Sequence, residues 1–66
     1  MRLTINGEER SVPDALTVRA LLEHLGIRPE GVAVEVNLDV VKRAEHPRHP
    51  LKEGDAVEIV SFVGGG

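Results

Sequence analysis

A chain of 66 residues is long enough for one domain, and a domain of this size buries only about 60% of its unfolded surface. The absence of cysteine excludes a disulfide, a thiolate metal site and a cysteine nucleophile within this chain. A net charge of -3 and a single aromatic residue, Phe62, argue against binding to nucleic acid. No apolar run approaches the roughly 20 residues that span a bilayer, and residues 1–5 do not resemble a signal peptide. We therefore expect a cytoplasmic protein with no membrane contact.

The first segment has the period-two pattern of a half-buried strand, since Leu3 and Ile5 alternate with polar residues. Asn6-Gly7 is a favoured two-residue turn of a β-hairpin. Residues 8–12 are then the return strand. Their weak apolar content and two initial acids place this strand at an edge of the sheet.

Residues 17–25 have the strongest helix signal. Thr17 is suited to cap the first turn with its hydroxyl. Gly26 stands where a left-handed residue ends a helix, and Pro29 prevents the helix from resuming early. Apolar residues at i, i+3, i+4 and i+7 form one stripe: Val18, Leu21, Leu22 and Leu25. We expect this stripe to pack against a sheet.

Three segments follow the helix. Alternating valines at residues 32–36 predict a third strand, and the turn at residues 37–39 leads into a short fourth strand at residues 40–42. Residues 43–50 contain two prolines and no apolar period, so we expect an irregular surface loop whose positive charge orients an acidic partner. Leu51 is then the apolar anchor of a turn.

Two groups of side chains suggest chemistry at first sight: His24, His46 and His49 for a metal, and Glu53, Asp55 and Glu58 for acid–base catalysis. The histidine spacing on a segment broken by prolines, without a paired carboxylate, does not support a coordination geometry. A domain this small has little room for a pocket that excludes water around the acids. We expect neither a metal site nor independent catalysis.

The last strand, residues 56–63, is apolar on both faces toward its end. One face has the residues expected in the core, and Val60 and Phe62 lie on the other. An exposed apolar face beside a functional terminus predicts a docking surface, formed by Val60, Phe62 and the neighbouring Val63. The alternative is that the strand is central and that the preceding loop covers this face.

The chain ends in three glycines, Gly64, Gly65 and Gly66. Without a Cβ, this segment can pass through a channel too narrow for side chains. The Gly66 carboxylate is the only ionised group in the final eight residues, and it is inert as an acyl donor until a partner activates it with ATP. Residues 63–66 extend at most roughly 13 Å, enough to enter another protein's active site. The alternative is an ordinary frayed terminus.

The predicted order of elements is ββαβββ, with terminal strands long enough to pair in the middle of the sheet. This order predicts an α+β fold of the β-grasp type, with a mixed sheet of four to five strands and one helix packed across it. We expect the domain to comprise residues 1–63 and a flexible reactive tail to comprise residues 64–66.

This order occurs together with a distinctive set of residues: Asn37, Val40, Gly54-Asp55, Val57-Glu58-Ile59-Val60 and Phe62-Val63-Gly64-Gly65-Gly66. In this combination the whole chain resembles the ThiS family of thiamin-pathway sulfur carriers, and the glycine ending is the most specific part. The resemblance implies a ubiquitin-like fold and no bound cofactor. It identifies Gly65 and Gly66 as the family's terminal diglycine and Gly66 as the reactive residue.

The resemblance also implies the partners. An E1-like adenylating enzyme uses ATP and magnesium to activate the terminal glycine, and a cysteine desulfurase or another sulfur donor then converts it to a thiocarboxylate. Thiazole synthase takes that sulfur. In this scheme the chain is a protein co-substrate without catalytic side chains. Three alternatives stay open: the small subunit of molybdopterin synthase, a ubiquitin-like modifier of lysines, and an interaction module whose glycines have no chemical role.

Overall fold

The five predicted strands and the predicted helix form in the expected order in the computed structural model, which describes residues 1–62. The elements are β1 (Arg2–Ile5), β2 (Glu8–Ser11), α1 (Val18–His24), β3 (Val32–Val36), β4 (Asp39–Val41), the 3-10 helix η1 (Arg43–Arg48) and β5 (Ala56–Ser61). The expected α+β class is confirmed. Within the described residues, no helix is both long and apolar enough to cross a membrane.

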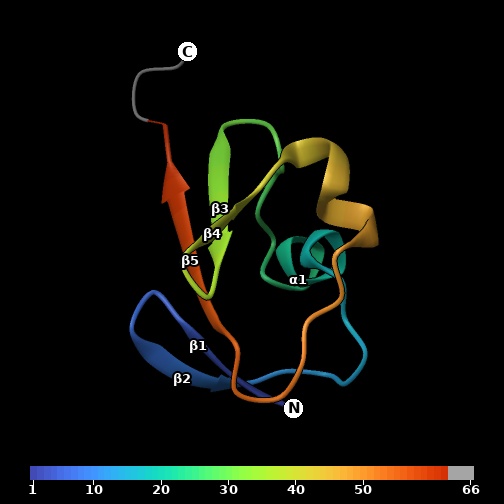
Figure 1. Cartoon of the computed structure of the whole chain (residues 1–66), viewed down its shortest axis with the longest axis vertical. Helices are drawn as coiled ribbons and strands as arrows, with labels where there is room; N and C mark the ends of the chain where they lie inside the picture. Colours follow the sequence, from blue (N-terminus) through green and yellow to red (C-terminus); the bar gives the residue numbers. More distant parts are fainter. Residues whose placement is uncertain (63–66) are drawn as a thin grey trace.

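The sheet has five strands in the order β2-β1-β5-β3-β4. β1 and β5 pair in parallel, and the other neighbouring strands pair antiparallel. The two terminal strands therefore lie side by side within the sheet, as predicted, and β2 is an edge strand. α1 packs across one face of this mixed sheet (Figure 1), which is the β-grasp arrangement.

The core lies between α1 and the sheet. The predicted helix stripe faces it, with three of its four residues fully buried and Leu25 half-buried. The buried apolar side chains are Leu3, Ile5, Val12, Val18, Leu21, Leu22, Val34, Val36, Val41, Leu51 and Val57. In each strand that contacts the core, alternate side chains point toward α1. The side chains between them therefore point to the opposite face of the sheet.

The helix ends are formed by the residues that the sequence indicates. The Thr17 hydroxyl accepts a hydrogen bond from the Ala20 amide at 3.1 Å. Gly26 has a φ of +73°, and its amide donates to the Glu23 carbonyl at 3.0 Å. The Ile27 amide donates to the Leu22 carbonyl at 2.8 Å, which completes a Schellman motif. These bonds satisfy backbone groups that a seven-residue helix leaves unpaired at its ends.

Two turn asparagines hold β5 from its two sides. Asn6, in the β1–β2 turn, accepts from the Ile59 amide at 2.7 Å and donates to the Ile59 carbonyl at 3.1 Å. Asn37, in the β3–β4 turn, accepts from the Ala56 amide at 3.0 Å and donates to an Asp55 carboxylate oxygen at 3.0 Å. Both asparagines have positive φ, which type I′ hairpin turns require. Each turn therefore also fixes the position of the central strand.

The prediction of an irregular surface loop at residues 43–50 was right about the surface, since most of the segment is exposed, but wrong about the irregular conformation of residues 43–48. η1 occupies most of this segment, and it contacts α1 on the helix side of the sheet. His46 is only 2% exposed, and its Nε2 lies 3.1 Å from the Val41 carbonyl oxygen, to which it donates. A search for apolar periodicity misses this anchor because it counts histidine as polar. Pro47 is compatible with the short 3-10 helix and lies inside it.

Asp55 is a buried carboxylate in the turn before β5, with only 4% of its surface exposed. It accepts from the Asn37 amide at 3.0 Å and from the Lys52 backbone at 2.9 Å. Burial alone would raise the pKa of Asp55, but these hydrogen bonds and the Lys52 charge outweigh it and hold that pKa below its ordinary value. The ionised form is therefore part of the folded structure.

We predict that Asp55→Asn lowers the free energy of unfolding at neutral pH by about 1–3 kcal/mol, because a buried donor loses its charged acceptor. Since the folded pKa lies below the unfolded one, the stabilisation by Asp55 is present above the ordinary pKa of 3.8 and is lost as the pH falls through the folded value. Urea unfolding between neutral and acidic pH measures both effects. The exposed Asp39→Asn variant is the control, and an unchanged acid slope in Asp55→Asn would contradict the prediction.

Candidate functional site

The chain leaves the sheet at the end of β5. The strand ends at Ser61, whereas the sequence predicted that it extends to residue 63. The Phe62 amide still donates to the Gly31 carbonyl at 2.9 Å. Figure 1 shows this exit at the opposite end of the domain from the N-terminus. The predictions for Val63, Gly64, Gly65 and Gly66, and the boundary between domain and tail, lie outside the described residues.

The sheet face opposite α1, here called the outer face, is apolar near this exit. Val60 is 56% exposed and Phe62 is 58% exposed. The cross-strand neighbour of Val60 is Ala33, and the residue that binds the Phe62 amide is Gly31. These two small residues leave the larger side chains uncovered. The exposure excludes a core position for Phe62.

The alternative, that the preceding loop covers the outer face, was wrong. Residues 43–48 form η1, which packs beside α1 on the other side of the sheet (Figure 1). The strand is central, as that alternative supposed, but its outer face is open. The exposed side chains of Val60 and Phe62 are therefore available to another molecule.

The sequence pattern did not indicate that Val40 lies on this face. Val40 is exposed on the edge strand β4, directly opposite Glu35 of β3. Leu38, in the preceding turn, is also exposed and has a φ of +73°. A branched apolar side chain is uncommon at a left-handed turn position. The unusual position of Leu38 can be recognised from the sequence only once the turn type is known.

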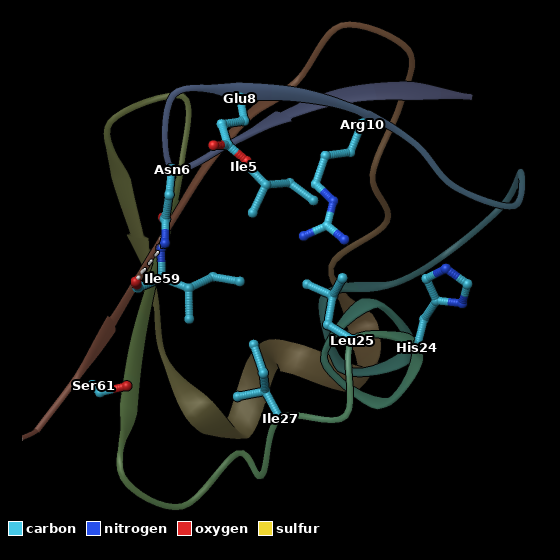
Figure 2. A pocket seen from close by; sticks show the side chains of 9 residues that line it. All are labelled: Ile5, Asn6, Glu8, Arg10, His24, Leu25, Ile27, Ile59 and Ser61. Atoms are coloured by element: carbon cyan, nitrogen blue, oxygen red, sulfur yellow. Dashed lines mark hydrogen bonds between the residues drawn. The ribbon is translucent and has the colours of Figure 1, made fainter.

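A groove of about 540 Å³ lies on the helix side, between the end of α1 and the β1–β2 hairpin. Its lining residues are Ile5, Asn6, Glu8, Arg10, His24, Leu25, Ile27, Ile59 and Ser61. In Figure 2 the Arg10 guanidinium extends over the groove, and the His24 ring lies at its rim. Among the described residues, neither Val60 nor Phe62, which were predicted to dock a partner, lines this groove.

The described part of the chain contains no cluster of three or more His, Cys, Asp or Glu side chains that could hold a metal ion. His46 is buried and donates to the Val41 carbonyl, so it is part of the packing between η1 and the sheet. The acidic residues near the start of β5 have different surroundings. Asp55 is buried in its turn, whereas Glu58 lies exposed on β5.

Comparison with known proteins decides the family. The model of the ThiS family matches residues 3–66 of this chain. The chain belongs to the ThiS family. The match includes the three C-terminal glycines and almost the whole β-grasp domain, so the resemblance seen in the sequence is confirmed.

Two relatives of about the same length agree with this membership. The sulfur carrier protein ThiS of Thermus thermophilus is 39% identical over 62 residues, which cover 94% of this chain and 95% of that protein. The crystal structure of the thiamine biosynthesis protein ThiS from Geobacter metallireducens matches with a TM-score of 0.87 at 40% identity, covering 100% of both chains. This structural match confirms the ubiquitin-like β-grasp fold.

Two further relatives are much longer. A thiazole synthase of Paramagnetospirillum magneticum is 47% identical over the whole of this chain, and one of Magnetococcus marinus is 42% identical. The ThiS-family chain spans only 20% of the length of each. A segment similar to this domain therefore occurs within proteins that bear the name thiazole synthase.

The structure separates the residues on which the family resemblance rests into two groups. Asn37 and Asp55 bind each other and fix the start of β5, so their role in this ThiS-family chain is structural. Val40, Val60 and Phe62 are exposed on or beside the outer face. The second group is available for contact with a partner.

Proposed function

We propose that this chain is a sulfur carrier protein of thiamin biosynthesis. Its Gly66 carboxylate is adenylated and then converted to a thiocarboxylate that donates sulfur to thiazole synthase. The main support is the match to the ThiS family over residues 3–66, because it includes the glycine ending on which this chemistry depends. The carboxylate is the chain's own reactive group, and no described side chain takes part in bond making.

The conversion of the carboxylate to a thiocarboxylate takes three steps. A Gly66 carboxylate oxygen attacks the α-phosphorus of ATP, and pyrophosphate leaves, which gives a mixed anhydride with a good leaving group. The terminal sulfur of a persulfide then attacks the acyl carbon, and AMP leaves. A thiol cleaves the resulting sulfur–sulfur bond, becomes oxidised to a disulfide, and releases the thiocarboxylate. The E1-like adenylating enzyme holds the ATP and magnesium, and a cysteine desulfurase or a comparable donor supplies the persulfide in the cytoplasm.

The outer face is the surface that we assign to docking. Val60 and Phe62 are exposed there, and the chain continues from Phe62 directly into Val63 and the glycine tail. A partner that covers these side chains is therefore positioned to receive the tail in its active site. Because the same surface would serve the adenylating enzyme and thiazole synthase, the two partners would bind in turn and compete for the carrier.

The longer relatives support thiazole synthase as a partner. A segment similar to this chain occurs in proteins named thiazole synthase, and it accounts for a fifth of their length. Joining a carrier to the enzyme that consumes its sulfur would raise the effective concentration of one for the other.

The proposal is tested by ATP–pyrophosphate exchange with the adenylating enzyme of the same organism. Exchange is expected to require the wild-type carrier, and Gly65→Ala is expected to slow it by about tenfold or more, because a methyl group crowds a channel shaped for glycine. Gly65→Ala should melt like wild type, since residues 3–57 supply the buried apolar side chains of the described core. Equal exchange rates for wild type and Gly65→Ala would refute the channel, and no exchange with wild type would refute activation by this enzyme.

A further inference from the structure

Two carboxylates oppose each other on the outer face. Glu35 of β3 and Glu58 of β5 are directly opposite in the antiparallel register. Cβ atoms in such pairs are about 4.5–5.5 Å apart, and like charges placed in this way destabilise a sheet. Within residues 1–62 neither carboxylate has an ion-pair partner. The sheet therefore keeps an unfavourable pair that its own side chains do not neutralise.

The pair lies between apolar side chains. Val40 is directly opposite Glu35 on one side, and Val60 is two residues from Glu58 on the same face of β5. Both valines are exposed, so an exposed apolar side chain lies beside each carboxylate. A partner that covers Val40 and Val60 also removes water from the two carboxylates. This desolvation is costly unless the partner supplies a positive charge and hydrogen-bond donors.

We propose that the partner presents an arginine side chain, set among apolar residues, to Glu35 and Glu58. This inference rests on the proposed function, which identifies the adenylating enzyme as the partner to test. A guanidinium has five N–H donors in a planar fork and so can bind two neighbouring carboxylates, whereas a lysine is a compact point charge with three donors. The pair thus opposes folding of the free carrier and favours the complex.

The test uses Glu35→Gln and Glu58→Gln, which remove a charge and keep the shape of the side chain. Each variant is expected to melt about 1–8 °C above wild type, because the repulsion is gone. Titration calorimetry with the purified adenylating enzyme, without ATP, should give a Kd at least about fivefold higher for each variant. Raising NaCl from about 50 to about 300 mM should weaken binding of wild type more than that of either variant.

Glu45→Gln is the matched control, because it changes the net charge equally but lies on η1, away from the outer face. Its Kd is expected to stay within about twofold of wild type. The arginine contact is overturned if Glu35→Gln and Glu58→Gln also bind like wild type, or if their losses do not exceed that of Glu45→Gln.

Measuring binding without ATP separates this inference from the proposed function. A carrier whose Kd depends on the glutamate pair but whose Gly66 never gains sulfur would refute sulfur transport and support the docking contact. A carrier that gains sulfur, but binds equally well without either charge, would refute the arginine contact alone. If wild type does not bind the adenylating enzyme at all, both are refuted.

Discussion

Deletion of Gly66 is expected to lower the rate of adenylation by at least about 100-fold, because displacement of a reacting group by as little as 1 Å can cost that much. Shortening the tail by one residue withdraws the carboxylate by roughly 3.3–3.6 Å from the position that it reaches beyond Phe62. The free energy of unfolding should change by less than about 0.5 kcal/mol, since glycine has no side chain to pack and residues 3–57 supply the buried apolar side chains of the described core. ATP–pyrophosphate exchange and urea unfolding measure the two quantities.

Gly64→Ala is the control for this deletion, because it also leaves only two glycines at the end but keeps the length of the tail. It is expected to be activated at close to the wild-type rate. If the deletion variant is activated as fast as Gly64→Ala, the reach of the tail does not limit activation, and the requirement for a terminal residue at position 66 is wrong.

Phe62→Ala is expected to raise the Kd for the adenylating enzyme by about 30-fold, the effect of losing a contact worth about 2 kcal/mol at an interface hot spot. The ring is 58% exposed and its backbone remains bound to Gly31, so the variant should melt close to wild type. Titration calorimetry and thermal unfolding monitored by circular dichroism measure these two properties.

Leu21→Ala is the contrasting variant, since Leu21 is fully buried on α1. It should lose about 2–5 kcal/mol of stability through the cavity that it creates. A loss of that size in Phe62→Ala, or an unchanged Kd, would exclude the outer face as the docking surface.

Local sequence signals predicted most of the fold because the physics behind them is local. A type I′ turn needs residues that tolerate positive φ, and Asn6-Gly7 supplies them. The α1 boundaries follow from a hydroxyl at Thr17 and a left-handed glycine at Gly26, each of which satisfies nearby backbone groups. Such signals do not depend on distant parts of the chain.

The missed features depend on contacts between distant residues. His46 is buried because η1 packs beside α1, and the Val41 carbonyl accepts a hydrogen bond from its ring. No periodicity in residues 43–50 reveals this. The Glu35–Glu58 pair exists only once the register of β3 and β5 is fixed. The sequence identified Val60 and Phe62 as docking candidates, but it did not show that Ala33 and Gly31 leave them uncovered.

The intact mass of the protein after incubation with ATP, magnesium, the adenylating enzyme, a cysteine desulfurase and cysteine tests sulfur transport most directly. We predict a gain equal to the replacement of one oxygen by sulfur, which fragmentation locates on Gly66, and the loss of this sulfur when thiazole synthase and its substrates are added. Conjugates that link Gly66 to lysines would indicate a protein modifier instead. An unchanged mass, while a control ThiS protein gains sulfur under the same conditions, would contradict the assignment as a sulfur carrier.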